Sequence, residues 1–373
     1  NGLSSTWGGA AGDGLWATAG NWDKGVPGLG LKSRGHDRAT LSEAGAAQPR
    51  VVTLPNGKVE LRTLNLAAPA GSGYTLVSGG TASQLWLYSQ GVPAGLTVSG
   101  GTHTLGLPVV LESDLLVTVN GTAAGLTVSG SGSIGQQGFS AALVKAGSGS
   151  FALSSANAYS GGTTLNEGIL LVQNSAALGT GSLQINAGVL DATAVALNTG
   201  SLTLAGGSLN LAVGRPLTAS GAALLDGTVN VSGTVSSATV GRYTLLSGTT
   251  VGGSLIQGSV PEPVNYYLGL SGGSLNLQRR ATMGSLTAAV VAPSIITGGS
   301  VAVNARIFNI APLLSDDLAL SLVALDNLSG GTAASGIGAG FSSGTLGGLW
   351  YTGTAVGALQ TGTLRALGVN TTN

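Results

Sequence analysis

The chain has 373 residues, of which 65 are glycine, and only 8% of the residues are charged. Lysine plus arginine and aspartate plus glutamate both number 14, so the formal net charge is zero, and the chain contains no cysteine. This composition excludes disulfide scaffolds and cysteine-ligated metal sites, and it argues against nucleic-acid binding, which needs clustered positive charge. A hydrophobic content of 43% predicts a folded chain. No apolar run reaches the roughly 18 residues of a membrane span.

Residues 1–50 are expected to form an N-terminal aromatic cap. They hold Trp7, Trp16 and Trp22, three of the five tryptophans of the chain. The terminal coil of a solenoid otherwise exposes its core and an unpaired strand edge, and large aromatic side chains can cover both. Because aromatic faces also stack on sugars, Trp16 and Trp22 are candidates for glycan contact, but the cap is the favoured interpretation.

Residues 51–281 form a repeat zone of short alternating segments. Leu, Val, Ile and Thr alternate with polar residues, and Gly, Ser or Asn ends each segment, as in residues 96–101, 183–188 and 202–207. Several repeats lie near 20 residues apart, which predicts an all-β fold built as a β-solenoid, with a right-handed β-helix as the expected form. Asparagines 174, 186, 198 and 210 recur every 12 residues, a spacing too short for one coil.

Residues 282–373 differ in sequence pattern from the repeat zone. Longer alternating segments at residues 286–291, 300–308 and 317–325 are separated by turn signals. This pattern predicts a small C-terminal antiparallel β-sandwich.

Residues 143–179 contain a dense pattern of glycine, leucine and single polar residues. Its characteristic residues are Leu143, Lys145, Gly147, Gly149, Leu153, Asn157, Tyr159, Gly161, Gly162, Thr163, Gly168, Leu170, Ala177, Leu178 and Gly179. This stretch resembles the autotransporter-associated β-strand repeat, which occurs in large secreted bacterial surface proteins. One position departs from the family pattern, with Phe151 in place of a leucine.

The resemblance implies a β-helical, passenger-like stalk that is exported and then displayed at the cell surface or released. It does not imply an enzyme. The chain starts at Asn1 without a methionine, so we expect a mature, processed fragment. The expected location is extracellular or at the surface of a bacterial cell.

Candidate catalytic groups are sparse. Enzymes with a β-helix fold collect carboxylates on one face, whereas Glu167, Asp191 and Asp226 are the three acids between residues 115 and 260. We therefore predict no catalytic, cofactor-binding or metal-binding residue. The pairs Glu112/Asp114 and Asp316/Asp317 are interpreted as turns, and whether calcium binds near either pair is left open.

The leading hypothesis is a non-catalytic extracellular structural protein that self-assembles into a filament, sheath or matrix. Scarce charge leaves strand edges with little protection against pairing, so one copy would add a terminal strand to the next. Residues 1–8 and 368–373 are the expected assembly segments, represented by Asn1, Leu3, Trp7, Val369 and Asn373. The alternative is a surface adhesin stalk whose sandwich or Trp16 and Trp22 bind glycans. The expected partner is a second copy, with surface glycans as the other candidate.

Overall fold

The computed structural model describes residues 2–29, 36–42, 50–235, 242–263 and 266–279, together with six short strands between residues 287 and 364. The chain forms two compact units. The first contains Asn1–Val235, Tyr243–Pro261 and Leu268–Leu277, and the second contains the remaining residues.

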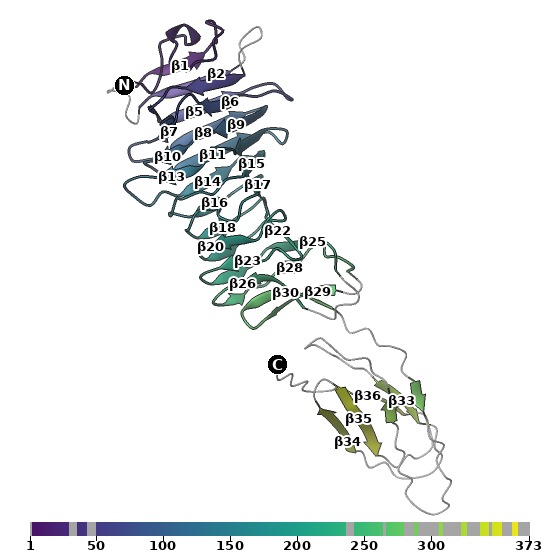
Figure 1. Cartoon of the computed structure of the whole chain (residues 1–373). Coiled ribbons are helices and arrows are strands. Elements are labelled where there is room, and N and C mark those ends of the chain that lie inside the picture. Colours follow the sequence, from purple (N-terminus) through teal and green to yellow (C-terminus); the bar gives the residue numbers. More distant parts are fainter. Residues whose placement is uncertain are drawn as a thin grey trace, which may run out of the picture. The chain divides into compact units, whose positions relative to one another are not determined.

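The first unit is a β-solenoid whose successive coils pair strand on strand in parallel (Figure 1). Sheet A forms one side of the coils. Its eleven strands are β1 (Ser4–Trp7), β2 (Arg38–Ser42), β5 (Thr63–Ala67), β8 (Ala94–Ser99), β11 (Leu115–Asn120), β14 (Leu143–Ala146), β16 (Thr163–Leu165), β18 (Leu183–Ile185), β21 (Leu202–Leu204), β24 (Ala223–Leu225) and β27 (Val251–Gly252).

Sheet B forms a second side and is also wholly parallel. Its ten strands are β3 (Val51–Leu54), β6 (Thr75–Ser78), β9 (Thr102–Gly106), β12 (Gly125–Val128), β15 (Ser150–Leu153), β17 (Ile169–Val172), β19 (Val189–Asp191), β22 (Ser208–Ala212), β25 (Thr228–Ser232) and β28 (Ile256–Gln257).

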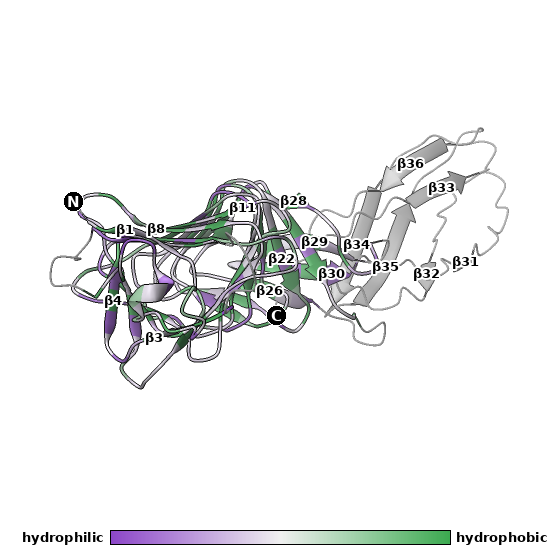
Figure 2. Ribbon diagram, turned by 90° about the horizontal axis from the view of Figure 1, so that it is seen from above, coloured by the Kyte–Doolittle hydropathy of each residue, from purple (hydrophilic) through white to green (hydrophobic). Residues whose placement is uncertain are grey.

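The third side is divided between two sheets. Sheet C contains β4 (Lys58–Leu61), β7 (Gln84–Leu87), β10 (Val109–Leu111) and β13 (Ile134–Gln136). Sheet D contains β20 (Leu197–Thr199), β23 (Leu217–Ala219), β26 (Tyr243–Ser247), β30 (Ser274–Arg279) and β29 (Tyr266–Ser271), and β30 runs antiparallel to β26. Figure 2 shows β1 and β8 on one side of the coils, β4 on a second and β3 on a third.

Side-chain alternation builds the core. Leu126, Phe151, Leu170, Leu190 and Leu209 occupy the same register position on five successive strands of sheet B, and all five are buried. Burying one such side chain contributes about 1.5–3 kcal/mol. The interior is therefore a stack of apolar rows, one row for each inward position of the coil.

The corner between sheets A and B requires glycine. Gly168, Gly188 and Gly207 have left-handed backbones, with φ of 73°, 77° and 68°. A Cβ atom on each would lie 2.4–2.5 Å from a carbonyl oxygen of the preceding coil, which no side chain tolerates. Because each coil brings one such corner to the same place, the near-20-residue spacing and the high glycine content have one cause.

Asparagine ladders follow this coil spacing. Asn186 Nδ2 donates to Asn166 Oδ1 (2.8 Å), and Asn230 Nδ2 donates to Asn210 Oδ1 (2.9 Å). Each pair joins neighbouring coils. The 12-residue recurrence in the sequence therefore does not produce these ladders.

The predicted all-β solenoid is confirmed. The only helix in the described part of the chain is the short 3-10 helix η1 (Ala19–Asn21), and no described helix is long and apolar enough to cross a bilayer. Because β1 and β2 belong to sheet A, coil stacking begins inside the segment assigned to the cap. The handedness and the predicted boundaries at residues 50 and 281 stay predictions.

The second unit contains three antiparallel strand pairs. They are β31 (Thr287–Ala289) with β32 (Arg306–Phe308), β33 (Leu322–Asp326) with β36 (Gln360–Leu364), and β34 (Gly336–Ser342) with β35 (Thr345–Thr352). The other residues of the predicted sandwich lie outside the described residues, and the sandwich stays a prediction.

Candidate functional site

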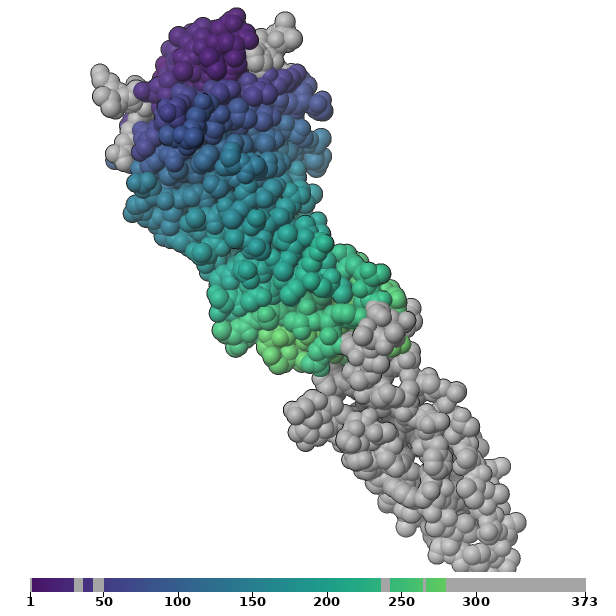
Figure 3. All heavy atoms as spheres, in the orientation of Figure 1, coloured from purple at the N-terminus to yellow at the C-terminus, as the bar shows by residue number. Residues whose placement is uncertain are grey.

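The N-terminal residues supply hydrogen-bonding partners to β2, β3 and β4, in sheets A, B and C. In sheet A, β1 pairs with β2. In sheet B, Trp16 N donates to Thr53 O (2.9 Å) and Thr53 N to Gly14 O (2.8 Å), and in sheet C, Glu60 N donates to Gly28 O (3.0 Å). These residues lie at one end of the stack (Figure 3). The cap therefore covers edges that would otherwise recruit strands.

The three tryptophans form a buried cluster beneath this cap. Trp7 and Trp16 have no exposed surface and Trp22 has 6%, and the Trp22 ring meets the other two edge to face at 5.2 and 4.7 Å. Trp16 Nε1 donates to Pro27 O (3.0 Å), and Trp22 Nε1 donates to Trp16 O (2.8 Å). Stacking a sugar on either ring would require the cluster to open. Glycan contact at Trp16 and Trp22 stays a prediction, which this packing does not favour.

The outer edge of β1 is already hydrogen-bonded. Thr6 O accepts from Asp23 N (3.1 Å), and Thr6 N donates to Asp23 Oδ1 (2.7 Å), a bond that lowers the pKa of Asp23. Leu3 N donates to Asp37 Oδ1 (2.8 Å), and the Trp7 side chain is buried. Strand addition at Leu3 and Trp7 would have to displace these bonds.

Three of the predicted assembly residues, Asn1, Val369 and Asn373, lie outside the described residues. Strand addition at the two chain ends therefore stays a prediction.

The coil at residues 143–172 contains a lysine in the solenoid interior. Lys145 lies between Val117 and Leu165 in the register of sheet A, and its side chain has no exposed surface. Its Nζ donates to Ala146 O (2.8 Å), Gly147 O (2.6 Å) and, in the next coil, Glu167 O (3.1 Å). Burial lowers the pKa of Lys145 to about 8, an effect that the Glu167 carboxylate opposes. The ammonium group thus joins two coils at the glycine corner.

On the third side of the solenoid, one sheet ends and another begins around this same coil. Sheet C ends at β13 and sheet D begins at β20, and residues 154–162 and 173–182, all of them described, contain no strand. Asn157 crosses this gap, because its Oδ1 accepts from Ile134 N (2.7 Å) and its Nδ2 donates to Ala177 O (2.5 Å). The amide side chain thereby reinforces the backbone bonds from Ala158 N to Ile134 O (2.8 Å) and from Asn157 N to Ala176 O (3.0 Å), which join the neighbouring coils where no strand is present.

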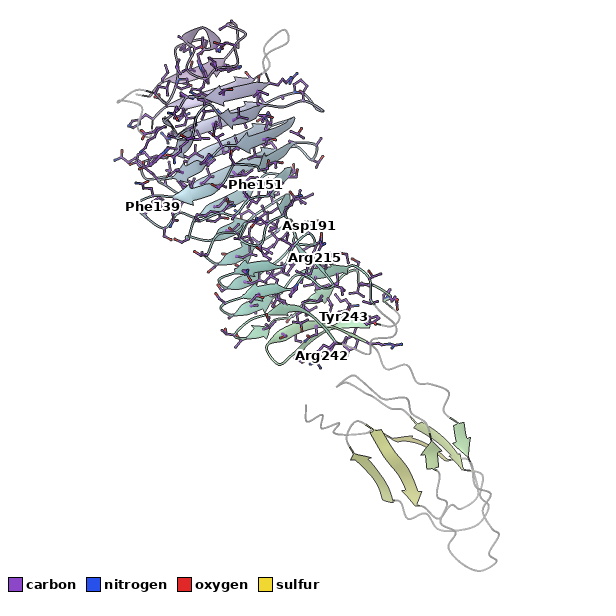
Figure 4. All side chains as sticks on the ribbon, viewed as in Figure 1. Phe139, Phe151, Asp191, Arg215, Arg242 and Tyr243 are labelled. Atoms are coloured by element: carbon purple, nitrogen blue, oxygen red, sulfur yellow. The ribbon has the colours of Figure 1, made fainter. Side chains whose placement is uncertain are left out.

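Tyr159 and Thr163 of this coil are also directed inward. Tyr159 is buried, and its hydroxyl group lies 2.7 Å from Thr163 Oγ1, which donates to Leu178 O (3.4 Å). Burial raises the pKa of Tyr159. Phe151, labelled in Figure 4, is buried and fills the position where the family pattern has leucine. These side chains pack and hydrogen-bond in the interior of the solenoid.

His103 is a buried histidine that the sequence reasoning did not single out. It occupies an inward position of β9 beside Leu126, with 1% exposure. Its Nδ1 accepts from Tyr74 N (3.0 Å) and its Nε2 donates to Gly100 O (2.9 Å), so the ring carries its proton on Nε2. Burial lowers the pKa of His103. The alternation of His103 with Leu105 is the sequence signal that could have identified His103 as an inward-facing residue.

The carboxylates of the solenoid are dispersed. Asp114 lies in the corner between β10 and β11, where its Oδ1 accepts from Ala142 N (2.8 Å). Asp191 and Arg215, both labelled in Figure 4, lie in neighbouring coils, and both hydrogen-bond to Thr193. Asp191 Oδ1 accepts from Thr193 N, and Arg215 donates to Thr193 O. No group of three or more potential metal ligands occurs in the part of the chain that the structure describes.

Two of the open sequence questions stay open. Calcium binding near Glu112 and Asp114 is untested, and Asp316 and Asp317 lie outside the described residues. The absence of catalysis also stays a prediction.

The comparisons single out the coil that contains Lys145 and Asn157. The family model described as passenger-associated-transport-repeat matches residues 143–172. Neither the curated proteins nor the solved structures contain a match. The predicted resemblance is confirmed, and the β-solenoid with this repeat in it fits a β-helix of the autotransporter passenger type.

Proposed function

We propose that the chain is a non-catalytic structural protein that is exported as a passenger and serves as a rigid rod at the cell surface. The observation that carries the proposal is the continuity of sheet A, whose eleven strands form one parallel array from β1 to β27. Deforming such an array breaks many backbone hydrogen bonds together. The role that this architecture supports best is therefore that of a stiff spacer that resists deformation.

The use of polar residues supports the same role. The most polar positions of the repeat, Lys145, Asn157 and Tyr159, hydrogen-bond inside the coil. Asp226, a candidate carboxylate, accepts from Ser254 N (2.8 Å) in the neighbouring coil. Catalytic carboxylates of polysaccharide-degrading enzymes act in close pairs, and this dispersed arrangement favours a structural protein.

The location is tested with antibodies raised against the solenoid and applied to intact and permeabilised cells of the source bacterium. We expect equal labelling of both samples, because an exported passenger lies outside the permeability barrier. Labelling only after permeabilisation would contradict the proposal.

The absence of catalysis is tested separately, by incubating the purified protein with neutral and acidic polysaccharides. We expect no release of reducing ends. Any saturable release that disappears in an Asp191→Asn variant would replace the structural proposal with an enzymatic one.

Self-assembly is the part of the proposal that needs a surface. The N-terminal edges of sheets A, B and C are covered by the cap, so association by strand addition at that end is disfavoured. Association through a side face of the solenoid would leave this cap intact.

A further inference from the structure

The outer face of sheet B is long and almost uncharged. All ten strands lie in the described part of the chain, and Asp191 is the one charged residue among their outward positions. Most of the other outward positions are threonine, serine or asparagine. The larger aliphatic ones are Val51, Val77, Ile169, Leu171, Val189 and Ile256, and Ala152 and Ala212 are also outward.

Three of the aliphatic residues form a cluster on this face. Ile169 and Val189 are direct neighbours in register on β17 and β19, and Leu171 lies one outward position further along β17. Val51 is 52% exposed, Ile169 39% and Ile256 59%. Soluble surfaces carry roughly 25–35% charged residues, which discourage association. Asp191 is the one charged side chain that gives this protection among the outward strand positions of sheet B.

The dimensions of the face suit a second copy. Ten strands about 4.8 Å apart extend for about 45 Å, and strands of two to five residues at about 3.3 Å each give a width of about 7–16 Å. Two such faces in contact would bury about 600–1,400 Å², and a specific protein interface needs about 1,000 Å² or more. The upper part of this range reaches the size of a specific interface.

The chemistry of the face favours an identical partner over a charged one. A strongly charged protein or an anionic lipid surface would meet one charge here, that of Asp191, and most of its own charges would be desolvated without compensation. A second copy presents aliphatic side chains to aliphatic side chains and hydroxyl or amide groups to groups that both donate and accept, and Asp191, the register neighbour of Leu171, is the one carboxylate that each copy brings to the face. Two sheets pack in this manner about 10 Å apart, and a two-fold axis makes the contact self-complementary and closed.

We propose that the outer face of sheet B is a self-association surface through which two copies of this chain pack face to face. This lateral contact leaves the capped N-terminal end undisturbed. The proposal extends the structural role proposed above but does not depend on it, since purified protein tests the contact and labelled cells test the location.

Sedimentation of the full chain at about 1 to 100 µM measures the association. The test variant is Val51→Lys with Ile169→Lys, which introduces charge on sheet B. The matched control is Leu116→Lys with Leu224→Lys on the outer face of sheet A, where the exposures of 37% and 46% are similar. Circular dichroism verifies that each variant is folded.

We expect the wild type to dimerise in this range, the sheet B variant to dissociate at least about tenfold more readily, and the sheet A variant to behave as the wild type. Lysines on both copies would face one another across the contact, which explains the loss. A monomeric wild type, or equal behaviour of the two variants, would overturn the proposal.

A second measurement avoids charged substitutions. The chain has no cysteine, so Thr127→Cys on sheet B and Thr97→Cys on sheet A each provide a single site for a nitroxide label. Pulsed electron paramagnetic resonance then gives the distance between the labels of two copies. The face-to-face contact requires a shorter distance for the label at 127, and a shorter distance at 97 would refute it.

Discussion

The ammonium nitrogen of Lys145 lies 3.1 Å from the carbonyl oxygen of Glu167, which belongs to the next coil. A positive charge inside the solenoid is thus held by backbone carbonyl groups rather than by a carboxylate. Hydrogen bonds to a charged donor are stronger than neutral ones, but the charge is removed from water. These opposing effects make the coil sensitive to the protonation of one side chain.

Raising the pH is expected to stabilise the coil around Lys145. The pKa of Lys145 is about 8 in the folded state against 10.5 for an unperturbed lysine, so the unfolded chain binds more protons between these values. The free energy of unfolding therefore rises from pH 8 to pH 10.5, by about 1–3 kcal/mol.

Denaturant unfolding at both pH values, compared between the wild type and Lys145→Met, isolates this contribution. The exposed Lys24→Met serves as the matched control and should keep the wild-type dependence. If Lys145→Met shows the same increase as the wild type, the lysine is not buried as described.

Alanine at Gly168 is expected to destabilise the solenoid strongly. Its φ is 73°, and a Cβ atom would lie 2.4 Å from Gly147 O. We expect a loss of about 3 kcal/mol or more, from backbone strain and the clash together. The control is Gly121→Ala, whose φ of 91° carries the same strain but whose Cβ would meet nothing within 4 Å, so about 1 kcal/mol is expected. Equal losses in chemical denaturation would show that corner packing is unimportant.

Removing the Asn157 side chain should weaken the junction between sheets C and D. Asn157→Ala leaves Ile134 N and Ala177 O without these partners, at a cost of about 2–4 kcal/mol. The exposed Asn198→Ala, on β20, should change stability by less than about 0.5 kcal/mol. Hydrogen exchange should locate the loss of protection at Ile134, and protection unchanged there would contradict the bridging role.

Acid is expected to destabilise the coils around His103. Protonation would place a hydrogen on Nδ1, which now accepts from Tyr74 N, so two donors would face each other. Because burial lowers the pKa of His103 in the folded state, its contribution is present above about pH 6.5 and is lost as the pH falls through the folded value.

Thermal unfolding between pH 7.5 and 4.5 measures the effect of His103. His103→Gln should unfold with a weaker pH dependence, while His36→Gln, at an exposed histidine, should keep the wild-type behaviour. Both variants retain Asp13 and Asp23, whose acid titration therefore cancels in the comparison. An identical pH dependence in the two variants would exclude His103 as its source.

Deleting residues 2–29 should convert the protein into an aggregating species. The deletion removes β1 and the backbone partners of β3 and β4, so three sheet edges become available. We expect large assemblies in sedimentation, and they should persist when Val51→Lys and Ile169→Lys are also present. A soluble, monomeric deletion variant would mean that the cap does not protect the edges.

The all-β solenoid class of the fold could be predicted from the amino-acid sequence alone. Leu126, Phe151 and Leu170 alternate with polar neighbours, and alternation is a local property that decides which side chains face inward. The repeat at residues 143–172 could be identified for the same reason, because its pattern lies within a short stretch of chain.

The partners of the residues that the sequence pointed to become visible in the folded chain. Trp16 and Trp22 were interpreted as cap residues, with glycan contact as the alternative, and the structure shows that they pack against each other. The cross-coil partners, Glu167 O for Lys145 and Ala177 O for Asn157, lie about 20 residues away along the chain, and stacking, not local sequence, brings them within hydrogen-bonding distance. The contacts at each corner of a solenoid form only when the next coil packs against it. The local sequence pattern therefore predicts the strands but not these contacts between coils.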